Sequence, residues 1–222
     1  EAVQRTAGDI TDAIPWAYTL ADEFRAGILA YDADGMGAPV MKVAFQRLVG
    51  QRMALVMYRG SAGVMDPTGL YGEDGETRSE ARTKKLLRRG ESASCLRTNR
   101  DTFLNFRAQS WTWVRDRVKA THDAVQRARV GKLVNANPDN LLSISSKCKD
   151  LIGLKAELSM PKRVWSKNGK VQVEAVSDMK ARGLRSPNLA SSLIVAMAQS
   201  GSMVLVATPV DHELPDYLRA AG

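Results

Sequence analysis

The sequence predicts an α/β fold with a partly parallel sheet, and two observations carry this prediction. Two apolar runs of strand length, Gly27–Tyr31 and Met53–Tyr58, flank a segment of helical character at Pro39–Val49. A strand, a helix and a strand in succession typically form a crossover between parallel strands. Further along, short apolar segments on both sides of Asn168-Gly169 predict a β-hairpin, because Asn-Gly readily adopts the positive φ angles of a tight turn.

Helices are predicted where apolar residues recur every three to four positions. The first spans about Ile10 to Phe24, with Thr11 and Asp12 as N-cap candidates. The second, from Asn105 to Val130, is amphipathic, with charged residues on the side opposite its apolar face. That apolar face is formed by Trp111, Val114, Val118, Thr121 and Val125.

Two further helices are predicted in the second half of the chain. Asn140 is an N-cap candidate for a helix that continues to about Leu151. Ser186-Pro187-Asn188 predicts the start of another helix with an apolar body, because Pro is favoured in a first helical turn. Beyond Ser200, a short strand-like run and an acidic tail complete the chain.

The overall charge favours a polyanionic partner. Among 222 residues, 32 Lys and Arg stand against 24 Asp and Glu, for a formal net charge of +8. The segment 61–94 is rich in Gly and basic residues and is expected to be a mobile loop. No apolar run approaches the roughly 20 residues of a membrane span, and Cys95 and Cys148 lack the spacing of metal ligands. These observations predict a cytoplasmic protein with reduced thiols and no membrane partner.

Asp32 is the leading candidate for a functional residue. It follows an apolar strand directly and precedes the string Ala33-Asp34-Gly35-Met36-Gly37. Sheets of α/β proteins bind ligands at the carboxyl ends of their strands. A carboxylate there suits Mg²⁺ or Mn²⁺, and the two glycines would let a phosphate backbone approach closely. The alternative without a ligand is an acidic turn that caps the next helix.

Two other classes of site share part of the Asp32 pattern. Haloacid-dehalogenase-type phosphatases place Asp-x-Asp-Gly after an apolar strand, with the first Asp as the nucleophile. Met36 and the absence of a paired acidic motif downstream argue against that class. A calcium loop of the EF-hand type requires further ligands at a spacing that this segment lacks. A small-molecule phosphatase is therefore the least favoured hypothesis.

Five segments, taken in order, carry a resemblance to a known family. They are Tyr31–Ala38, Asn105–Arg117, Ala156–Ser159, Asn168–Val171 and Lys180–Ala190. Their order and spacing, over about residues 6 to 200, resemble the nuclease domain of the large terminase subunit of tailed bacteriophages. Residues 1–200 are therefore expected to form one nuclease domain, followed by a tail at 201–222.

The resemblance implies a ribonuclease-H-like mixed sheet flanked by helices, with a C-terminal β-hairpin. In that family three acidic residues bind two divalent metal ions that activate water for phosphodiester cleavage. By position, Asp32 matches the second acidic ligand, and Asp34 is an additional carboxylate. The implied reaction is metal-dependent cleavage of double-stranded DNA during genome packaging in the bacterial cytoplasm. The implied partners are the terminase ATPase domain, the small terminase and the portal, since no phosphate-binding loop of an ATPase occurs here.

Two departures from the family's pattern concern the other ligands. The first catalytic Asp belongs on an earlier strand, further upstream of Asp32 than this sequence extends, so the first strand is expected to be missing. The last ligand should follow the Ser-Pro-Asn-Leu-Ala string, where this chain has Ser191. A hydroxyl replaces a carboxylate poorly at a site with two cations. Glu157 and Asp178 are the candidates for compensation. The alternative function is a non-catalytic DNA-binding or assembly module of a packaging motor.

A basic region is expected to bind DNA whether or not the chain cuts it. Between Lys147 and Arg185 there are ten Lys and Arg against four Asp and Glu, a local balance of +6. Cationic side chains in such a region contact phosphates without reading sequence. The candidate DNA-binding residues are Lys162, Arg163, Lys167, Lys170, Arg182 and Arg185.

Overall fold

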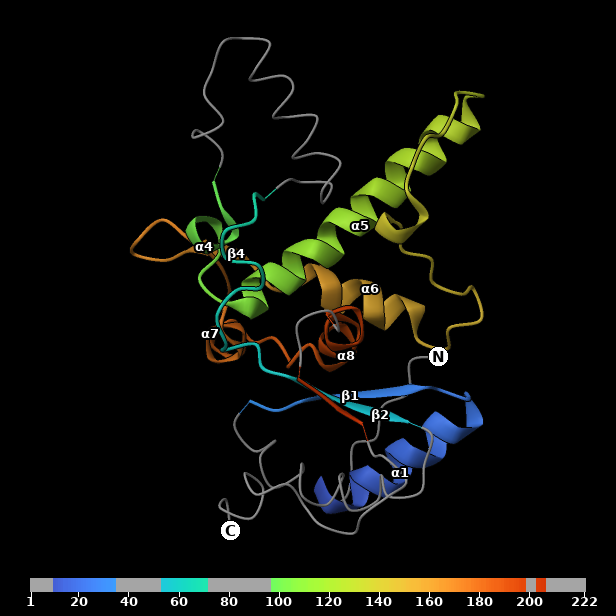
Figure 1. Cartoon of the computed structure of the whole chain (residues 1–222), viewed down its shortest axis with the longest axis vertical. Helices are drawn as coiled ribbons and strands as arrows, with labels where there is room; N and C mark the ends of the chain where they lie inside the picture. Colours follow the sequence, from blue (N-terminus) through green and yellow to red (C-terminus); the bar gives the residue numbers. More distant parts are fainter. Residues whose placement is uncertain (1–9, 35–52, 72–96, 199–202, 207–222) are drawn as a thin grey trace. The chain divides into compact units, whose positions relative to one another are not determined.

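The computed structural model describes residues 10–34, 53–71, 97–198 and 203–206, which form two compact units (Figure 1). The sheet unit comprises residues 10–34, 53–60, 198 and 203–206, and the helical unit comprises residues 61–71 and 97–197. Within these residues no helix is long and apolar enough to cross a membrane. Each unit is described by itself.

The sheet unit is built on a three-stranded mixed sheet in the order β1-β2-β6. β1 (Ile28–Asp32) and β2 (Ala54–Tyr58) run parallel, which confirms the prediction of a parallel pair. β6 (Met203–Val206) pairs with β2 in the antiparallel direction, so residues beyond position 200 contribute to the sheet. The helix predicted at Pro39–Val49 lies outside the described residues.

The helix α1 (Ile10–Glu23) forms where the apolar pattern predicts it. Its residues Ile14, Tyr18 and Ala21 recur on one face and form a core with Met53 and Leu55. The predicted N-caps are wrong, because the helix begins at Ile10 and residues 11 and 12 lie inside its first turn. Capping requires a residue with non-helical backbone angles, which the residues of a first turn do not have.

The two parallel strands differ in burial, since β1 is only partly buried and β2 is buried. Ile28 and Asp32 are exposed and the three residues between them are only half-buried, while Val56 to Tyr58 are buried. Among the described strands β1 lies at the end of the sheet and β2 in its centre. An apolar run therefore identified both strands but not their positions in the sheet.

The long helix α5 (Phe106–Arg129) dominates the helical unit (Figure 1). The side chain of Asn105 caps it by accepting a hydrogen bond from the Ala108 N–H at 3.0 Å. Only its first half is buried, and Val118 and Val125 are 45% and 42% exposed. The predicted apolar face is thus only partly covered, by contacts of α5 with β5 (Val171–Val173), α8 (Asn188–Met197) and the 3-10 turn η2 (Pro138–Asn140).

The helix predicted from Asn140 to Leu151 is wrong. Residues Pro138–Asn140 form a short 3-10 turn (η2), and the chain then continues without helix. The Leu142 N–H donates to the hydroxyl of Thr121 on α5 at 2.8 Å, which holds this segment against the helix. The real helix, α6 (Leu151–Ser159), begins after Asp150, whose carboxylate accepts a hydrogen bond from the Gly153 N–H at 2.9 Å.

The predicted hairpin is confirmed as β4 (Arg163–Trp165) and β5 (Val171–Val173). Gly169 has a φ of +68°, while Asn168 keeps a negative φ, so only the glycine of the pair adopts the left-handed conformation. The Gly169 N–H donates to the Ser166 carbonyl at 2.9 Å and closes the turn. This is a type I geometry ended by a left-handed glycine rather than a two-residue turn.

The end of the helical unit contains two helices, of which one was predicted. α8 (Asn188–Met197) begins directly after Pro187, as expected. The six-residue helix α7 (Val176–Ala181) was not predicted. The remaining helix, α4 (Asn99–Thr102), precedes α5 and is capped by the Thr98 hydroxyl.

The segment 61–71 is held by α5 and is not the mobile loop that its composition predicts. The fully buried Gln109 accepts a hydrogen bond from the Met65 N–H at 2.7 Å and donates one to the Met65 carbonyl at 3.0 Å. Tyr71 packs edge-on against Phe103, with 4.8 Å between the ring centroids. The rest of the predicted basic loop, including Cys95, lies outside the described residues. Cys148 is a free thiol.

Candidate metal and DNA-binding sites

Asp32 is the last residue of β1 and lies at the carboxyl end of both parallel strands. It is in register with Tyr58 at the end of β2, and the Ala33 N–H donates to the Tyr58 carbonyl at 2.8 Å. Asp32 is exposed, so its carboxylate is accessible to a ligand. The Asp34 N–H donates to Asp32 Oδ1 at 3.0 Å, which orients the carboxylate. The predicted placement of this residue at a sheet end is therefore what the structure shows.

Tyr31 anchors β1 on the face of the sheet opposite to Asp32. Side chains alternate along a strand, so Tyr31 and Asp32 point to opposite sides of the sheet. Tyr31 packs against the core of Ile14, Tyr18 and Leu55. Burial raises the pKa of its hydroxyl to about 12, against the opposing effect of Arg59. A neutral, half-buried Tyr31 thus anchors β1 on the face opposite to the exposed carboxylate.

The donor set at Asp32 fits a hard divalent cation only in part. Asp32 and Asp34 supply carboxylate oxygens, the ligands that Mg²⁺ and Mn²⁺ prefer. In the described part of the chain, no group of three or more His, Cys, Asp or Glu is placed to hold a metal ion. Among the described residues, the sheet end therefore provides one pair of acidic residues and not the three carboxylates of a two-metal site.

Ser191, where the resemblance predicts the last acidic ligand, lies in the first turn of α8. Its N–H donates to the Pro187 carbonyl at 2.8 Å, and the residue is half-buried. The neighbouring Ser192 donates through its hydroxyl to the Asn188 carbonyl at 2.9 Å. A neutral hydroxyl is a weak ligand for a divalent cation, so neither serine supplies what a carboxylate would.

The two residues considered for compensation differ in their surroundings. Glu157 on α6 accepts a hydrogen bond from the Ala190 N–H at 3.0 Å, so its carboxylate caps α8 one residue before Ser191. Asp178 is exposed in the first turn of α7. Glu157 therefore stabilises the start of α8, next to Ser191.

The basic hairpin exposes most of the predicted DNA-binding residues. Lys162, Arg163 and Lys167 are exposed, and Lys170 is half-buried. The guanidinium of Arg163 lies over the ring of Trp165, 4.5 Å from its centroid. Arg185 is also exposed, in the segment before α8.

Arg182 differs from the other predicted DNA-binding residues because it is engaged in an ion pair. It donates to both carboxylate oxygens of Glu174, at 2.8 and 2.7 Å, and to the Met160 carbonyl at 3.1 Å. The Glu174 side chain is 7% exposed. A hydrogen bond from the Lys162 N–H and the Arg182 guanidinium lower the pKa of Glu174. This pair was not predicted from the sequence, because no local pattern around Glu174 indicates that its side chain is buried.

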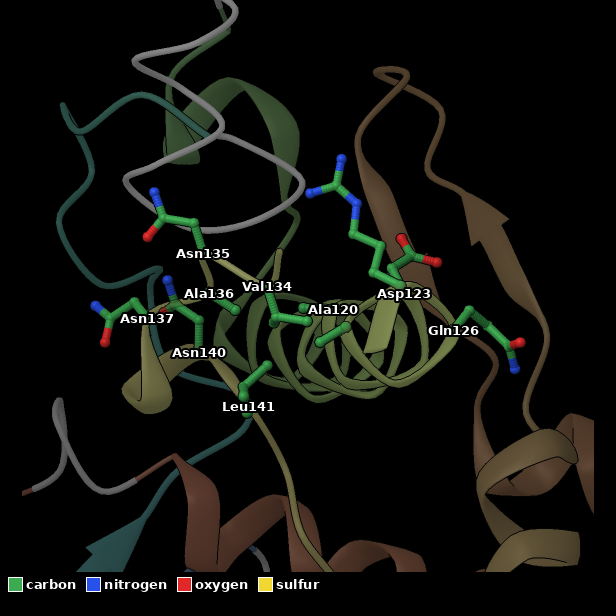
Figure 2. A pocket seen from close by; sticks show the side chains of 11 residues that line it. Ala120, Asp123, Gln126, Val134, Asn135, Ala136, Asn137, Asn140 and Leu141 are labelled. Atoms are coloured by element: carbon green, nitrogen blue, oxygen red, sulfur yellow. The ribbon is translucent and has the colours of Figure 1, made fainter. Parts of the chain in front are cut away.

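A pocket that the sequence did not indicate lies between α5 and the segment 134–141 (Figure 2). Asp123 and Gln126 come from the helix, while Asn135, Asn137 and Asn140 come from the segment after it. Asp123 is bound by Lys119 at 2.6 Å, and Asn137 caps η2. The pocket combines amide and alkyl groups with Arg127 and with the Asp123 carboxylate, which Lys119 already engages.

The structure is similar to several solved structures of one nuclease domain. The nuclease domain of the large terminase subunit gp2 of bacterial virus Sf6 has a TM-score of 0.67 and 29% identity, over 86% of this chain and 73% of that one. A mutant of the same domain with manganese and beta-thujaplicinol has a TM-score of 0.60 and 30% identity, over the same shares. A mutant with calcium has a TM-score of 0.66 and 29% identity, over 88% and 75%.

The chain belongs to the family of large terminase nuclease domains. Terminase nuclease domains have a ribonuclease-H-like α/β fold, so both the resemblance and the fold class predicted from the sequence are confirmed. Family membership supports a nuclease role in DNA packaging, and the structures with manganese and calcium point to divalent metal ions in this family. No protein-family model matches the sequence, and no curated protein matches it.

Proposed function

We propose that this terminase nuclease domain is a divalent-metal-dependent endonuclease that cleaves double-stranded DNA during viral genome packaging. The observation that carries the proposal is the exposed carboxylate of Asp32 at the common carboxyl end of β1 and β2. A mutant of the similar domain of bacterial virus Sf6 was solved with manganese, which supports the binding of a divalent metal ion by this chain. Asp32 is the proposed catalytic metal ligand, and Asp34 is an auxiliary carboxylate.

Mg²⁺ or Mn²⁺ is the proposed cofactor, in the two-metal arrangement expected for the family. The chemistry that such ions supply is the activation of water and the stabilisation of the leaving oxygen. Asp32 would hold one ion through its carboxylate, which the Asp34 N–H orients. Ser191 marks the position at which this chain departs from the usual acidic set.

The proposed DNA contacts lie on the hairpin. Lys162, Arg163, Lys167 and Lys170 would bind phosphates, with Arg185 extending the basic surface. Arg182 would contribute through its ion pair with Glu174, which joins the end of the hairpin to α7. Further proposed partners are the terminase ATPase domain, the small terminase and the portal, in the cytoplasm of the bacterial host.

The second candidate function is a non-catalytic DNA-binding or assembly module of the packaging motor. Two observations favour it: Ser191 stands where a carboxylate is expected, and the described residues contain no cluster of three metal ligands. Two divalent ions repel one another, and three anionic ligands normally offset that repulsion. With fewer carboxylates the fold and the basic hairpin would still bind DNA.

Nicking of supercoiled plasmid at low salt with Mn²⁺ separates the two candidates. The chain is compared with Asp32→Asn and with Ser191→Asp, which restores the family's carboxylate. Cleavage by the unaltered chain that is lost in Asp32→Asn supports the endonuclease. Plasmid that is retarded in a gel by all three proteins but cut by none of them, or only by Ser191→Asp, supports the binding module.

A further inference from the structure

Trp165 is an exposed aromatic residue on the basic hairpin. Its residue is 57% exposed, whereas the other described tryptophans, Trp16, Trp111 and Trp113, are partly buried. An indole ring in water forgoes the stabilisation that burial provides. Neither a metal site nor contacts with phosphates accounts for an indole at this position.

The ring of Trp165 contacts Arg163, and the strand that carries it is paired with a strand that contains a buried residue. Arg163, two residues earlier on the same face of β4, places its guanidinium 4.5 Å from the ring centroid. In the paired strand, Val171 lies in register with Trp165 and is buried in a core with Phe103. The strand under the indole is therefore anchored, while more than half of the residue still faces solvent.

The charges around the ring suit a nucleic acid strand. Residues 162–173 include four basic side chains and no acidic one. Two of them, Lys167 and Lys170, belong to the turn and its end, and Arg97 donates to the Gly169 carbonyl of the same turn at 3.5 Å. Asp101 is the acidic group that interacts with Lys170 and offsets part of its charge. The balance remains strongly positive.

We propose that Trp165 and Arg163 form a base-stacking site for an unpaired nucleotide of single-stranded or frayed DNA. A base can stack on the exposed indole while the neighbouring lysines bind the adjoining phosphates, a combination typical of proteins that bind single strands. The paired bases inside a duplex are stacked on each other and cannot use such a site. The inference rests on the proposed function, because an endonuclease in packaging produces DNA ends that can fray.

The test compares a labelled single-stranded oligonucleotide with a blunt duplex of the same length, using fluorescence anisotropy. Trp165→Ala should weaken single-strand binding about tenfold, as expected for the loss of one stacked base. Duplex binding should change less than twofold. Trp165→Phe should restore part of the loss, because a phenyl ring still stacks. Ile152→Ala, which removes another exposed apolar side chain, should change neither affinity.

Tryptophan emission provides an independent readout. The single strand should quench the component of emission that is absent in Trp165→Phe, whereas the blunt duplex should leave it unchanged. Lys167→Ala should weaken the binding of single-stranded and duplex DNA equally. This variant therefore separates contacts with phosphates from stacking. Equal losses for both kinds of DNA in Trp165→Ala, or no loss for either, would overturn the stacking site.

The outcome is distinguishable from a failure of the proposed function. Loss of single-strand preference in Trp165→Ala without plasmid cleavage by the unaltered chain would keep the stacking site and remove the endonuclease. Cleavage that depends on Asp32, together with unchanged single-strand binding in Trp165→Ala, would keep the endonuclease and remove the stacking site.

Discussion

Arg182 and Glu174 form a bidentate ion pair in which Arg182 donates to both carboxylate oxygens, at 2.8 and 2.7 Å. Glu174 follows β5 directly, and Arg182 ends α7, so the pair ties the hairpin to the helix after it. The Lys162 N–H donates to the same carboxylate at 3.0 Å. This ion pair therefore helps to position the hairpin, which carries most of the residues that we propose to bind DNA.

Arg182→Ala is expected to destabilise the helical unit rather than simply to remove a DNA contact. The substitution leaves the buried carboxylate of Glu174 without its charged partner, which costs more than the loss of an exposed charge. The midpoint of thermal unfolding should fall by several degrees in Arg182→Ala. In Arg185→Ala, which removes an exposed charge, it should fall by less than one degree. Calorimetry of both variants checks this expectation. Equal midpoints for the two would contradict a structural role for the pair.

The stability of the chain should also depend on pH through Glu174. Its folded-state pKa is lowered from the ordinary value of 4.5, so the ion pair stabilises the fold fully above that value. The contribution should be lost as the pH falls below 4.5 through the depressed folded pKa. Urea unfolding measured between about pH 3 and pH 6 should show a smaller pH dependence in Arg182→Ala than in the unaltered chain. An identical dependence would assign the effect to other carboxylates.

Gln109→Leu should destabilise the chain by about 2–4 kcal/mol, because it leaves the N–H and the carbonyl of Met65 without their partner. Gln109→Met is the matched control, since it keeps a side chain of similar length and also removes both hydrogen bonds. Its loss should be similar to that of Gln109→Leu. Urea unfolding gives both values, and a neutral effect of Gln109→Leu would show that water replaces the side chain.

Substitutions at Glu157 distinguish its capping of α8 from metal binding. Glu157→Gln keeps an oxygen that accepts from the Ala190 N–H, so stability should be nearly unchanged. Glu157→Ala removes the acceptor and should cost about 1 kcal/mol, as for other lost helix caps. Mn²⁺ binding, measured by calorimetry, should be the same in Glu157→Gln and the unaltered chain. A large loss of Mn²⁺ affinity in Glu157→Gln would instead make this residue a ligand.

Asp32→Asn should abolish Mn²⁺ binding at the sheet end and leave the fold intact. The amide keeps the size of the side chain and an oxygen that can accept from the Asp34 N–H, but it removes the negative charge that a divalent ion requires. Circular dichroism checks the fold, and calorimetric titration checks the binding. Unchanged Mn²⁺ affinity would remove Asp32 from the metal site.

Features with a local cause could be predicted from the sequence. The apolar runs of β1 and β2, the Asn-Gly of the hairpin and the Ser-Pro-Asn start of α8 each specify backbone conformation within a few residues. The position of Asp32 at the end of β1 followed in the same way. Local preference predicts the wrong structure at Asn140, where the Leu142 N–H donates to Thr121 on α5 and the chain continues without helix.

Short-range periodicity and turn chemistry are enough to predict the α/β class, the parallel pair of strands, the hairpin and the carboxylate at the strand end. Which side chains hold the fold together depends instead on tertiary packing. Gln109 bonds to a residue 44 positions away, and Glu157 caps a helix 33 positions away. Arg182 likewise proved to be half of an ion pair. Such partners are selected by packing between distant segments, which no local pattern encodes.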